Sequence, residues 1–175
     1  MAAEKENKMR EIKIEKVVLS IGSGTETEGA ERAVLLLNKL SGSKAVKTIA
    51  RKRIATWKLR PGLHIGAMVT VRGKKADELL KLLLQAIENE IKKTSFTNNG
   101  FSFGIKEYID IPGIKYDAKI GIIGLNVTVA LKRAGYRVKN RKLCQTKLPK
   151  HHEINAEEAA SFAQQKLGVK LKAED

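Results

Sequence analysis

The sequence predicts an α+β protein: a mostly antiparallel sheet, two helices packed on one face and a long basic protruding loop. Two observations lead to this class. Segments rich in β-branched residues alternate with two segments of helical periodicity, and turn signals separate several of the strands. The 175 residues fit one domain, and 42% hydrophobic residues are enough to build its core. The face of the sheet without helices would be free to meet a partner.

The first strand and the first helix are predicted within residues 12–42. The segment IKIEKVVLSIG (12–22) is apolar and β-branched, and it ends at a glycine. A helix follows, with Thr25 or Thr27 as its N-cap and Gly42 as its stop. Its apolar residues recur at helical spacing and predict one buried stripe, made of Ala30, Ala33, Val34, Leu37 and Leu40.

The next two strands are predicted to form a hairpin with an unusually long connection. One strand begins near residue 44 and runs to residue 49, and the other is the alternating segment GAMVTVRG (66–73). Loops as long as the one between them (about 49–66) are usually functional or disordered in compact domains.

The clearest helix is predicted at residues 74–94. Its core face consists of apolar residues at helical spacing, namely Ala76, Leu79, Leu80, Leu83, Ile87 and Ile91. Asn99-Gly100 is then a strong turn signal. The strand after that turn is expected to reach Pro112-Gly113, with an alternating apolar face of Phe101, Phe103, Ile105, Ile109 and Ile111.

A further strand is predicted within residues 119–133. Asn126 and Thr128 would point outward, and the inward residues would be Ile123, Leu125, Val127, Val129 and Leu131. From Ala134 the chain is basic and rich in turns, and a short helix is predicted at residues 155–168 with Asn155 or the neighbouring turn as its cap. We therefore expect a flexible tail (1–10), an α+β core that contains the protruding loop (11–135) and a basic C-terminal extension (136–175).

Charge is the most informative bulk property. Lys and Arg number 34 against 19 Asp and Glu, so the net charge is +15, and residues 32–76 and 118–152 contain no carboxylate side chain. Repulsion among these cations disfavours the compact state unless a polyanion neutralises them. We expect nucleic acid as the partner. The alternatives are a merely soluble basic surface, or an anionic membrane surface, which is disfavoured because neither interval resembles a long amphipathic helix.

Signals for catalysis or metal binding are weak. The segment GSGTETEG (22–29) joins a strand to a helix as nucleotide-binding loops do, but Thr27 stands where GxGxxG needs its third glycine. The pair His151-His152 lacks a third ligand at a suitable spacing, so a solvated or RNA-facing pair is preferred. Cys144 is the only cysteine and has no histidine–acid partner set. We expect no enzymatic activity, no metal and no cofactor.

The basic loop IARKRIATWKLRPGLHIG (49–66) is a stronger signal. It contains the only tryptophan, Trp57, and no carboxylate. Lysine and arginine neutralise phosphates, and a tryptophan ring offers a face on which an unpaired base can stack. Two interpretations of Trp57 remain open, a stacking platform for RNA or a core anchor at the root of the loop.

Four segments together resemble one family of ribosomal proteins. They are MREIKIEKVVLSIGSG, KLSGSKAVKTIARKRIATWKLRPGLHIGAMVTVRG, FSFGIKEYIDIPGIKYD and IGIIGLNVTVALKRAG, and they cover most of residues 9–135. In order and spacing they are similar to the universal L-five family of large-subunit ribosomal proteins, in its archaeal form. The resemblance implies an antiparallel sheet with helices on one side and a structural role in the cytoplasmic ribosome.

The resemblance also implies the functional residues. Contacts to 5S rRNA would come from Lys16, Ser20, Ser43, Lys44, Thr70 and Arg72. The loop that approaches P-site tRNA and rRNA would present Arg51, Lys52, Arg53, Trp57, Lys58 and Arg60. Additional rRNA contacts are expected from Lys132, Arg133, Arg137, Lys139, Arg141 and Lys142.

The implied partners are 5S rRNA, adjacent large-subunit rRNA, P-site tRNA, neighbouring proteins of the central protuberance and a small-subunit bridge protein, with no membrane. Two other functions remain as alternatives. One is an RNA-binding module outside the ribosome, such as an RNA chaperone, and the other is an enzyme that binds a nucleotide at the Gly22–Gly24 loop.

Overall fold

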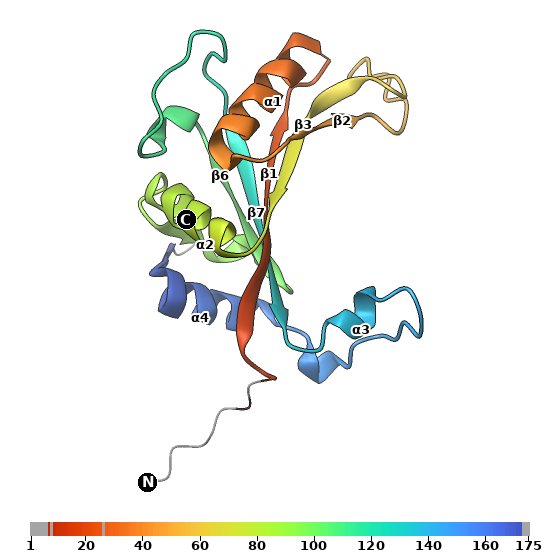
Figure 1. Ribbon diagram of the computed structural model, residues 1–175, viewed down its shortest axis with the longest axis vertical. Helices are drawn as coiled ribbons and strands as arrows, with labels where there is room; N and C mark the ends of the chain where they lie inside the picture. Colours follow the sequence, from red (N-terminus) through yellow and green to blue (C-terminus); the bar gives the residue numbers. More distant parts are fainter. Residues whose placement is uncertain (1–6, 8, 26, 173–175) are drawn as a thin grey trace.

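The computed structural model describes residues 7, 9–25 and 27–172, and they form an α+β fold around a mostly antiparallel sheet, as predicted (Figure 1). In the described residues this main sheet has six strands in the order β2-β3-β1-β7-β6-β5. In chain order these strands are β1 (Ile12–Gly22), β2 (Val46–Ile49), β3 (His64–Val71), β5 (Phe96–Thr97), β6 (Gly100–Ile105) and β7 (Leu125–Arg133).

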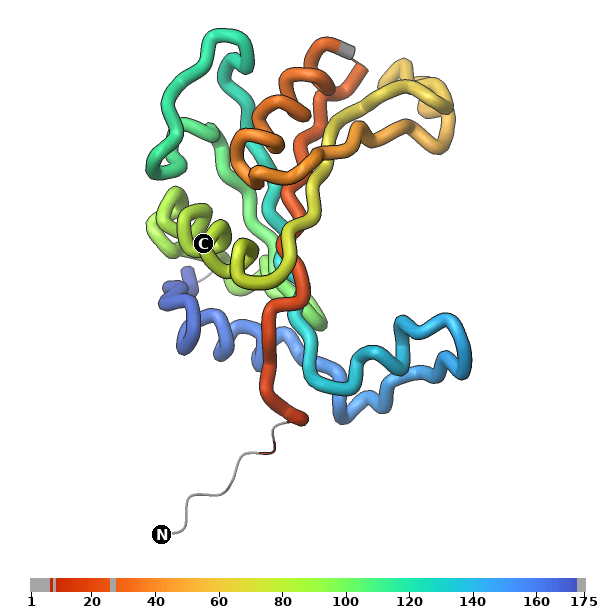
Figure 2. Tube along the Cα trace, in the orientation of Figure 1, coloured from red at the N-terminus to blue at the C-terminus, as the bar shows by residue number. Residues whose placement is uncertain are grey.

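The helices and a small second sheet complete the fold. A parallel pair of short strands lies beside the main sheet, β4 (Glu90–Lys92) with β8 (Lys170–Lys172). The helices are α1 (Thr27–Ser41), α2 (Lys74–Gln85), α3 (Arg137–Asn140) and α4 (Ala156–Leu167). The tube view shows α1 and α2 on one side of the main sheet and α4 near its lower end (Figure 2).

Alternation along the central strands builds the core. In β1, Val17 and Leu19 are completely buried, whereas Val18 and Ser20, which alternate with them, are half-buried on the other face. The partner strand β7 repeats this pattern, with Val127 and Val129 completely buried and the intervening polar residues exposed. Since successive side chains of a strand point to opposite faces, one face of the sheet packs on the helices and the other is left open.

The C-terminal helix α4 packs against the same core. Its buried residues include Ala159, Phe162 and Ala163, and it lies against β5 and β6. The prediction of its limits is confirmed. The backbone N–H of Asn155 donates to the Glu158 carboxylate at 3.1 Å, and Gly168 adopts a left-handed conformation directly after the helix.

Three sequence-based limits are wrong. The helix α2 ends at Gln85 rather than near residue 94, because Glu88 and Asn89 both have positive φ angles of 54° and 60° and turn the chain away from the helix. Ile91, assigned to the helix core face, is indeed buried, but it belongs to strand β4. A short apolar run is compatible with either element, and periodicity alone does not distinguish them.

The strand β6 is also shorter than predicted. It ends at Ile105, and a 3-10 turn (Tyr108–Asp110) follows, in which Tyr108 is completely buried and Ile109 is 37% exposed. The next strand, β7, begins at Leu125 and not at residue 119. The pairing with β6 sets this start, because Leu125 lies opposite Ile105, the last residue of β6. The predicted N-cap of α1 is not settled, because residue 26 and the side chain of Thr27 lie outside the described part.

Candidate nucleic-acid interface

The face of the main sheet opposite α1 and α2, which we call the open face, carries mostly polar and small side chains. Strand register sets their neighbours. Val18 lies between Thr70 of β3 and Thr128 of β7, and Ser20 lies between Met68 and Asn126. The residues that define this face are Lys13, Lys16, Val18, Ser20, Met68, Thr70, Arg72, Ser102, Asn126, Thr128 and Lys132.

The structure brings four of the six residues predicted to bind 5S rRNA together on the open face. Lys16, Ser20 and Thr70 lie on adjacent strands. Arg72 follows buried Val71, which pairs with Val17, so alternation places Arg72 beside Lys16 on the same face. Hydroxyl groups and cations therefore share one surface, a combination suited to ribose and phosphate groups.

The other two predicted residues, Ser43 and Lys44, lie in the turn between α1 and the edge strand β2. Lys44 is exposed. Ser43 is half-buried and makes local hydrogen bonds: its N–H donates to Ser41 Oγ at 3.2 Å, and its hydroxyl donates to the Ser41 carbonyl at 3.4 Å. The Ser43 hydroxyl is thus already occupied by its own turn.

A β-bulge in β1 brings a further cation, Lys13, to the open face. Strict alternation along the sequence would place Lys13 and Lys16 on opposite faces. The register between β1 and β7 shifts between Ile14 and Lys16, so Lys13 pairs with Lys132 and Lys16 pairs with Ala130. Lys132 and Ala130 share one face of β7 because they are two residues apart. Both lysines of β1 therefore face the same side, and Lys13 joins the surface. Ser102, Asn126 and Thr128 were also missed as site residues, although alternation already marked the last two as outward.

The connection between β2 and β3, residues 50–63, is a narrow hairpin extension. The N–H of Ala50 donates to the Leu63 carbonyl at 2.8 Å, and Ile54 and Leu59 exchange backbone hydrogen bonds of 3.1 and 3.0 Å. Its predicted contact residues are all exposed, namely Arg51, Lys52, Arg53, Trp57, Lys58 and Arg60. None of these five cations forms an ion pair with another described residue.

Trp57 lies near the tip of this extension and is 65% exposed. The interpretation of Trp57 as a core anchor at the loop root is therefore wrong. The ring is available for stacking on a base or ribose, and the neighbouring Lys58 has a φ of 53°, which closes the turn at the tip.

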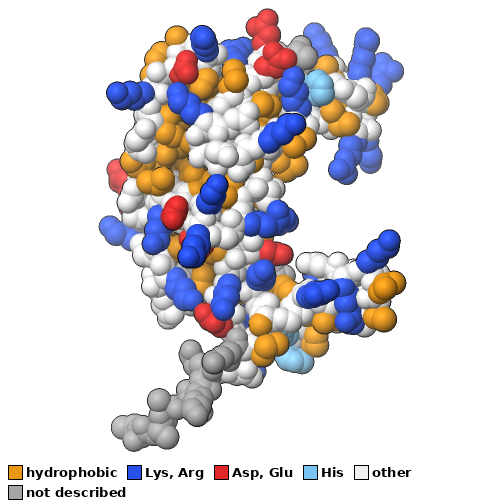
Figure 3. Space-filling model, viewed as in Figure 1, with side chains coloured by type: hydrophobic (Ala, Val, Ile, Leu, Met, Phe, Trp, Pro, Cys, Tyr) orange, Lys and Arg blue, Asp and Glu red, His pale blue; other side chains and the backbone are white. Residues whose placement is uncertain are grey.

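A second basic projection, which we call the arm, consists of residues 137–150 between β7 and α4. Its cations are all exposed, namely Arg137, Lys139, Arg141, Lys142, Lys147 and Lys150. The arm and the β2–β3 loop project on the same side of the molecule, and the space-filling view shows a hollow between them with Lys and Arg side chains at both ends (Figures 1 and 3).

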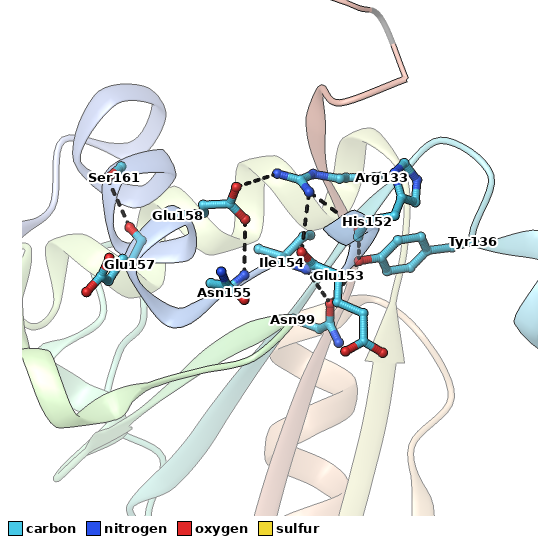
Figure 4. Close-up of polar contacts among 10 residues, drawn as sticks. All are labelled: Asn99, Arg133, Tyr136, His152, Glu153, Ile154, Asn155, Glu157, Glu158 and Ser161. Atoms are coloured by element: carbon cyan, nitrogen blue, oxygen red, sulfur yellow. Dashed lines mark hydrogen bonds and ion pairs between the residues drawn. The ribbon is translucent and has the colours of Figure 1, made fainter. Parts of the chain in front are cut away.

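Arg133 differs from the other predicted rRNA contacts because it is only 7% exposed (Figure 4). Its guanidinium donates to Glu158 Oε1 at 2.8 Å and to the carbonyl oxygens of His152 and Glu153 at 3.4 and 3.3 Å. Burial alone would raise the pKa of Glu158, but hydrogen bonds from the Asn155 N–H and from Arg133 outweigh it and lower the pKa. Because its guanidinium is buried and bonded within the protein, Arg133 is not among the exposed cations of the interface.

The structure also places the histidine pair and the cysteine that were considered for catalysis or metal binding. His151 is exposed, and His152 is half-buried with its Nε2 2.8 Å from the Ala134 carbonyl oxygen. The interpretation of a solvated or RNA-facing pair stays a prediction. Cys144 is free and exposed. No cluster of three or more His, Cys, Asp or Glu side chains able to hold a metal ion occurs among the described residues. Within the same residues no helix is long and apolar enough to cross a membrane.

An open, polar sheet face bordered by two basic projections is typical of the class of nucleic-acid-binding α+β proteins. Comparison with known proteins narrows this class. The family model for ribosomal protein L5 matches residues 7–60, and the model for the C-terminus of the same ribosomal family matches residues 64–162. The chain therefore belongs to the ribosomal protein L5 family, whose members are structural ribosomal proteins rather than enzymes.

Individual relatives support this assignment over nearly the whole chain. The large ribosomal subunit protein uL5 of Nanoarchaeum equitans is 50% identical over 167 residues, which cover 95% of this chain and 99% of the relative. The proteins of the same name from Sulfurisphaera tokodaii and Pyrobaculum aerophilum are 42% and 43% identical, over 94% and 93% of this chain and 94% and 92% of their own lengths. The predicted archaeal character is thus confirmed.

Proposed function

We propose that this protein binds 5S rRNA through the open face and contacts P-site tRNA through the β2–β3 loop, within the central protuberance of the large ribosomal subunit. The exposed cations of the arm make additional rRNA contacts. Neighbouring proteins of the central protuberance and a small-subunit bridge protein complete the set of proposed partners.

One observation carries the proposal. Lys16, Ser20, Thr70 and Arg72 come from two strands far apart in the sequence, and register places them side by side on a face that no helix covers. Cations supply attraction to phosphates, and hydroxyls distinguish ribose by bonding its 2′-OH. The family resemblance implied these residues as contacts to 5S rRNA, and their position on one surface supports the proposal.

Footprinting of purified 5S rRNA with and without the full-length protein tests this function. We expect a compact protected region whose protection weakens as salt rises, because phosphate contacts release counterions. A structured RNA of equal length, such as a tRNA, is the control for nonspecific attraction by a basic protein. Equal affinity for both RNAs at moderate salt would contradict the proposal.

A further inference from the structure

The arm contacts the rest of the protein only near its two ends, where half-buried Leu148 also packs against the core. Side chains 139–147 are all exposed. Hydrogen bonds within the arm shape it: the Thr146 N–H donates to the Val138 carbonyl at 3.3 Å, and Arg141 Nε donates to the Cys144 carbonyl at 2.7 Å. At its outgoing end, the N–H groups of Val138 and Lys139 donate to the carbonyls of Gly135 and Tyr136 at 3.2 and 3.1 Å. The direction in which the arm projects must therefore be set where it leaves β7 and where it returns to α4.

Both ends of the arm meet in one network at this root (Figure 4). The hydroxyl of Tyr136, at the outgoing end, lies 2.9 Å from Asn99 Oδ1 and 3.3 Å from the carbonyl oxygen of His152, at the returning end. Arg133 bridges that same carbonyl and Glu158 of α4. We call this network the root clasp: the side chains of Asn99, Arg133, Tyr136 and Glu158 with the His152 carbonyl.

The root clasp is anchored in the sheet through Asn99. Its Oδ1 also accepts a hydrogen bond from the Ile154 N–H at 3.2 Å, and its backbone carbonyl accepts one from the Leu131 N–H at 2.8 Å. The root is also conformationally restricted, because Gly135 has a φ of 91°, which L side chains rarely adopt. The clasp thus ties the β5–β6 turn, the end of β7 and the start of α4 to the two ends of the arm.

The position of the root links the arm to the open face. Lys132 lies on the open face directly before buried Arg133, and the exposed Arg137 begins the arm four residues later. Cations therefore run without a carboxylate from the sheet onto the arm, whose residues 137–150 contain none. Near the tip, Leu143 is 78% exposed beside Arg141 and Lys142, a combination that suits an unpaired base or ribose next to phosphates.

We propose that the root clasp fixes the direction of the arm, so that the arm lies against the same RNA molecule that binds to the open face. This inference rests on the proposed function, in which that RNA is 5S rRNA. Tyr136, Arg133 and Glu158 act in it as positioning residues: they touch no RNA but hold the six arm cations on the side of the molecule where the RNA lies.

The exposed and unique Cys144 allows a direct test in the full-length protein. An iron–EDTA group attached to Cys144 cleaves RNA only near the arm tip. With the wild-type protein we expect focused cleavage of 5S rRNA at or beside the open-face footprint. The variants Tyr136→Phe and Glu158→Gln should lose this focus, with weaker and more scattered cleavage, while the footprint of the open face persists.

Ser161→Ala is the matched control for Tyr136→Phe. It also removes one hydroxyl that bonds to a carbonyl, here Glu157 O at 2.9 Å, but it lies outside the root clasp. Its cleavage pattern should equal that of the wild type. Persistence of the footprint shows that a variant is folded, and Tyr136→Phe retains the buried ring, so it is the variant least prone to unfolding.

Two results would overturn the inference while the proposed function survives. One is a wild-type footprint on 5S rRNA with no cleavage from Cys144, and the other is focused cleavage that both clasp variants leave unchanged. Absence of any specific 5S footprint with the wild-type protein would instead overturn the proposed function itself.

Discussion

Lys13 and Lys16 point to the same face of the sheet although they are three positions apart on one strand. The register shift between Ile14 and Lys16 makes this possible, since it pairs the two lysines with Lys132 and Ala130, which lie on one face of β7. The bulge thus gathers three cations on the open face near the root of the arm.

Removal of Lys13, the cation that the bulge brings to the open face, should weaken RNA binding. For Lys13→Ala we expect the slope of log K against log salt for 5S rRNA to become shallower by about 0.7, the contribution of one phosphate contact. Lys81→Ala removes an exposed cation from α2, on the other side of the sheet, and should leave the slope unchanged. Titrations at several salt concentrations measure both, and equal slopes for Lys13→Ala and wild type would exclude Lys13 from the interface.

Thr70 provides a test for hydroxyl contacts. Thr70→Val keeps the shape and the β-branch of the side chain, and Thr70 is only half-buried on the open face, so the domain should remain folded. We expect about a two- to tenfold loss of 5S rRNA affinity from one lost hydrogen bond. The double variant with Lys16→Ala should bind more weakly still. Filter binding combined with circular dichroism separates loss of contact from loss of fold, and unchanged affinity of the double variant would refute this site.

The β2–β3 loop should act separately from the open face. Charge reversal of Arg51, Lys52 and Arg53 to glutamate should impair tRNA-linked function of ribosomes while 5S rRNA binding by the free protein stays nearly intact. The reason is geometric, because the loop projects away from the sheet residues proposed for 5S contacts. Translation assays with reconstituted subunits and 5S binding assays measure the two effects. Equal loss of both would contradict the division of labour.

Trp57 should contribute to RNA contact and not to stability. Because the side chain is 65% exposed, Trp57→Ala should change the free energy of unfolding by less than about 0.5 kcal/mol. As the only tryptophan, Trp57 also serves as a reporter: its emission in the free protein should be that of a solvated indole, and stacking on RNA should quench it. A blue-shifted emission in the free protein would show that the ring is buried.

The ion pair of Arg133 and Glu158 should make stability depend on pH. The pKa of Glu158 is lower in the folded protein than its usual value of 4.5, so the charged form stabilises the fold. This contribution is fully present above the unfolded-state pKa and is lost as pH falls through the folded-state pKa. Thermal unfolding should therefore show wild type more stable than Glu158→Gln at neutral pH, with the difference shrinking below pH 4.5. A difference that stays constant down to about pH 3 would rule out the ionised pair as its cause.

Much of the fold can be predicted from the sequence because alternation and helical periodicity are strong here. The buried alternation of β1 and β7 and the stripe of α1 follow from these patterns, as does the cap of α4. The end of α2 could not be predicted in this way, because it depends on positive φ angles at Glu88 and Asn89. Neither residue signals the end of a helix as clearly as glycine does.

The site could be predicted only in part for a related reason. Alternation marks outward residues such as Thr128, but the bulge that brings Lys13 to the same face depends on pairing with β7. In the sequence, Arg133 looks like the exposed cations around it. Tertiary packing, however, places Glu158 of α4 beside the Arg133 guanidinium and buries Arg133. The assignment of residues to 5S rRNA, tRNA and other rRNA stays a prediction, as do the proposed domain limits.

The parallel pairing of β4 with β8 has a consequence for synthesis of the chain. Glu90 is opposite Lys170, so the small sheet joins segments from the middle and the end of the described chain. A nascent polypeptide cannot form this pair until its residues 170–172 have left the exit tunnel, whereas β1 and β3 can pair much earlier. The small sheet, in which Ile91 pairs with Leu171, therefore forms only after the strands β1 and β3 are already available to each other.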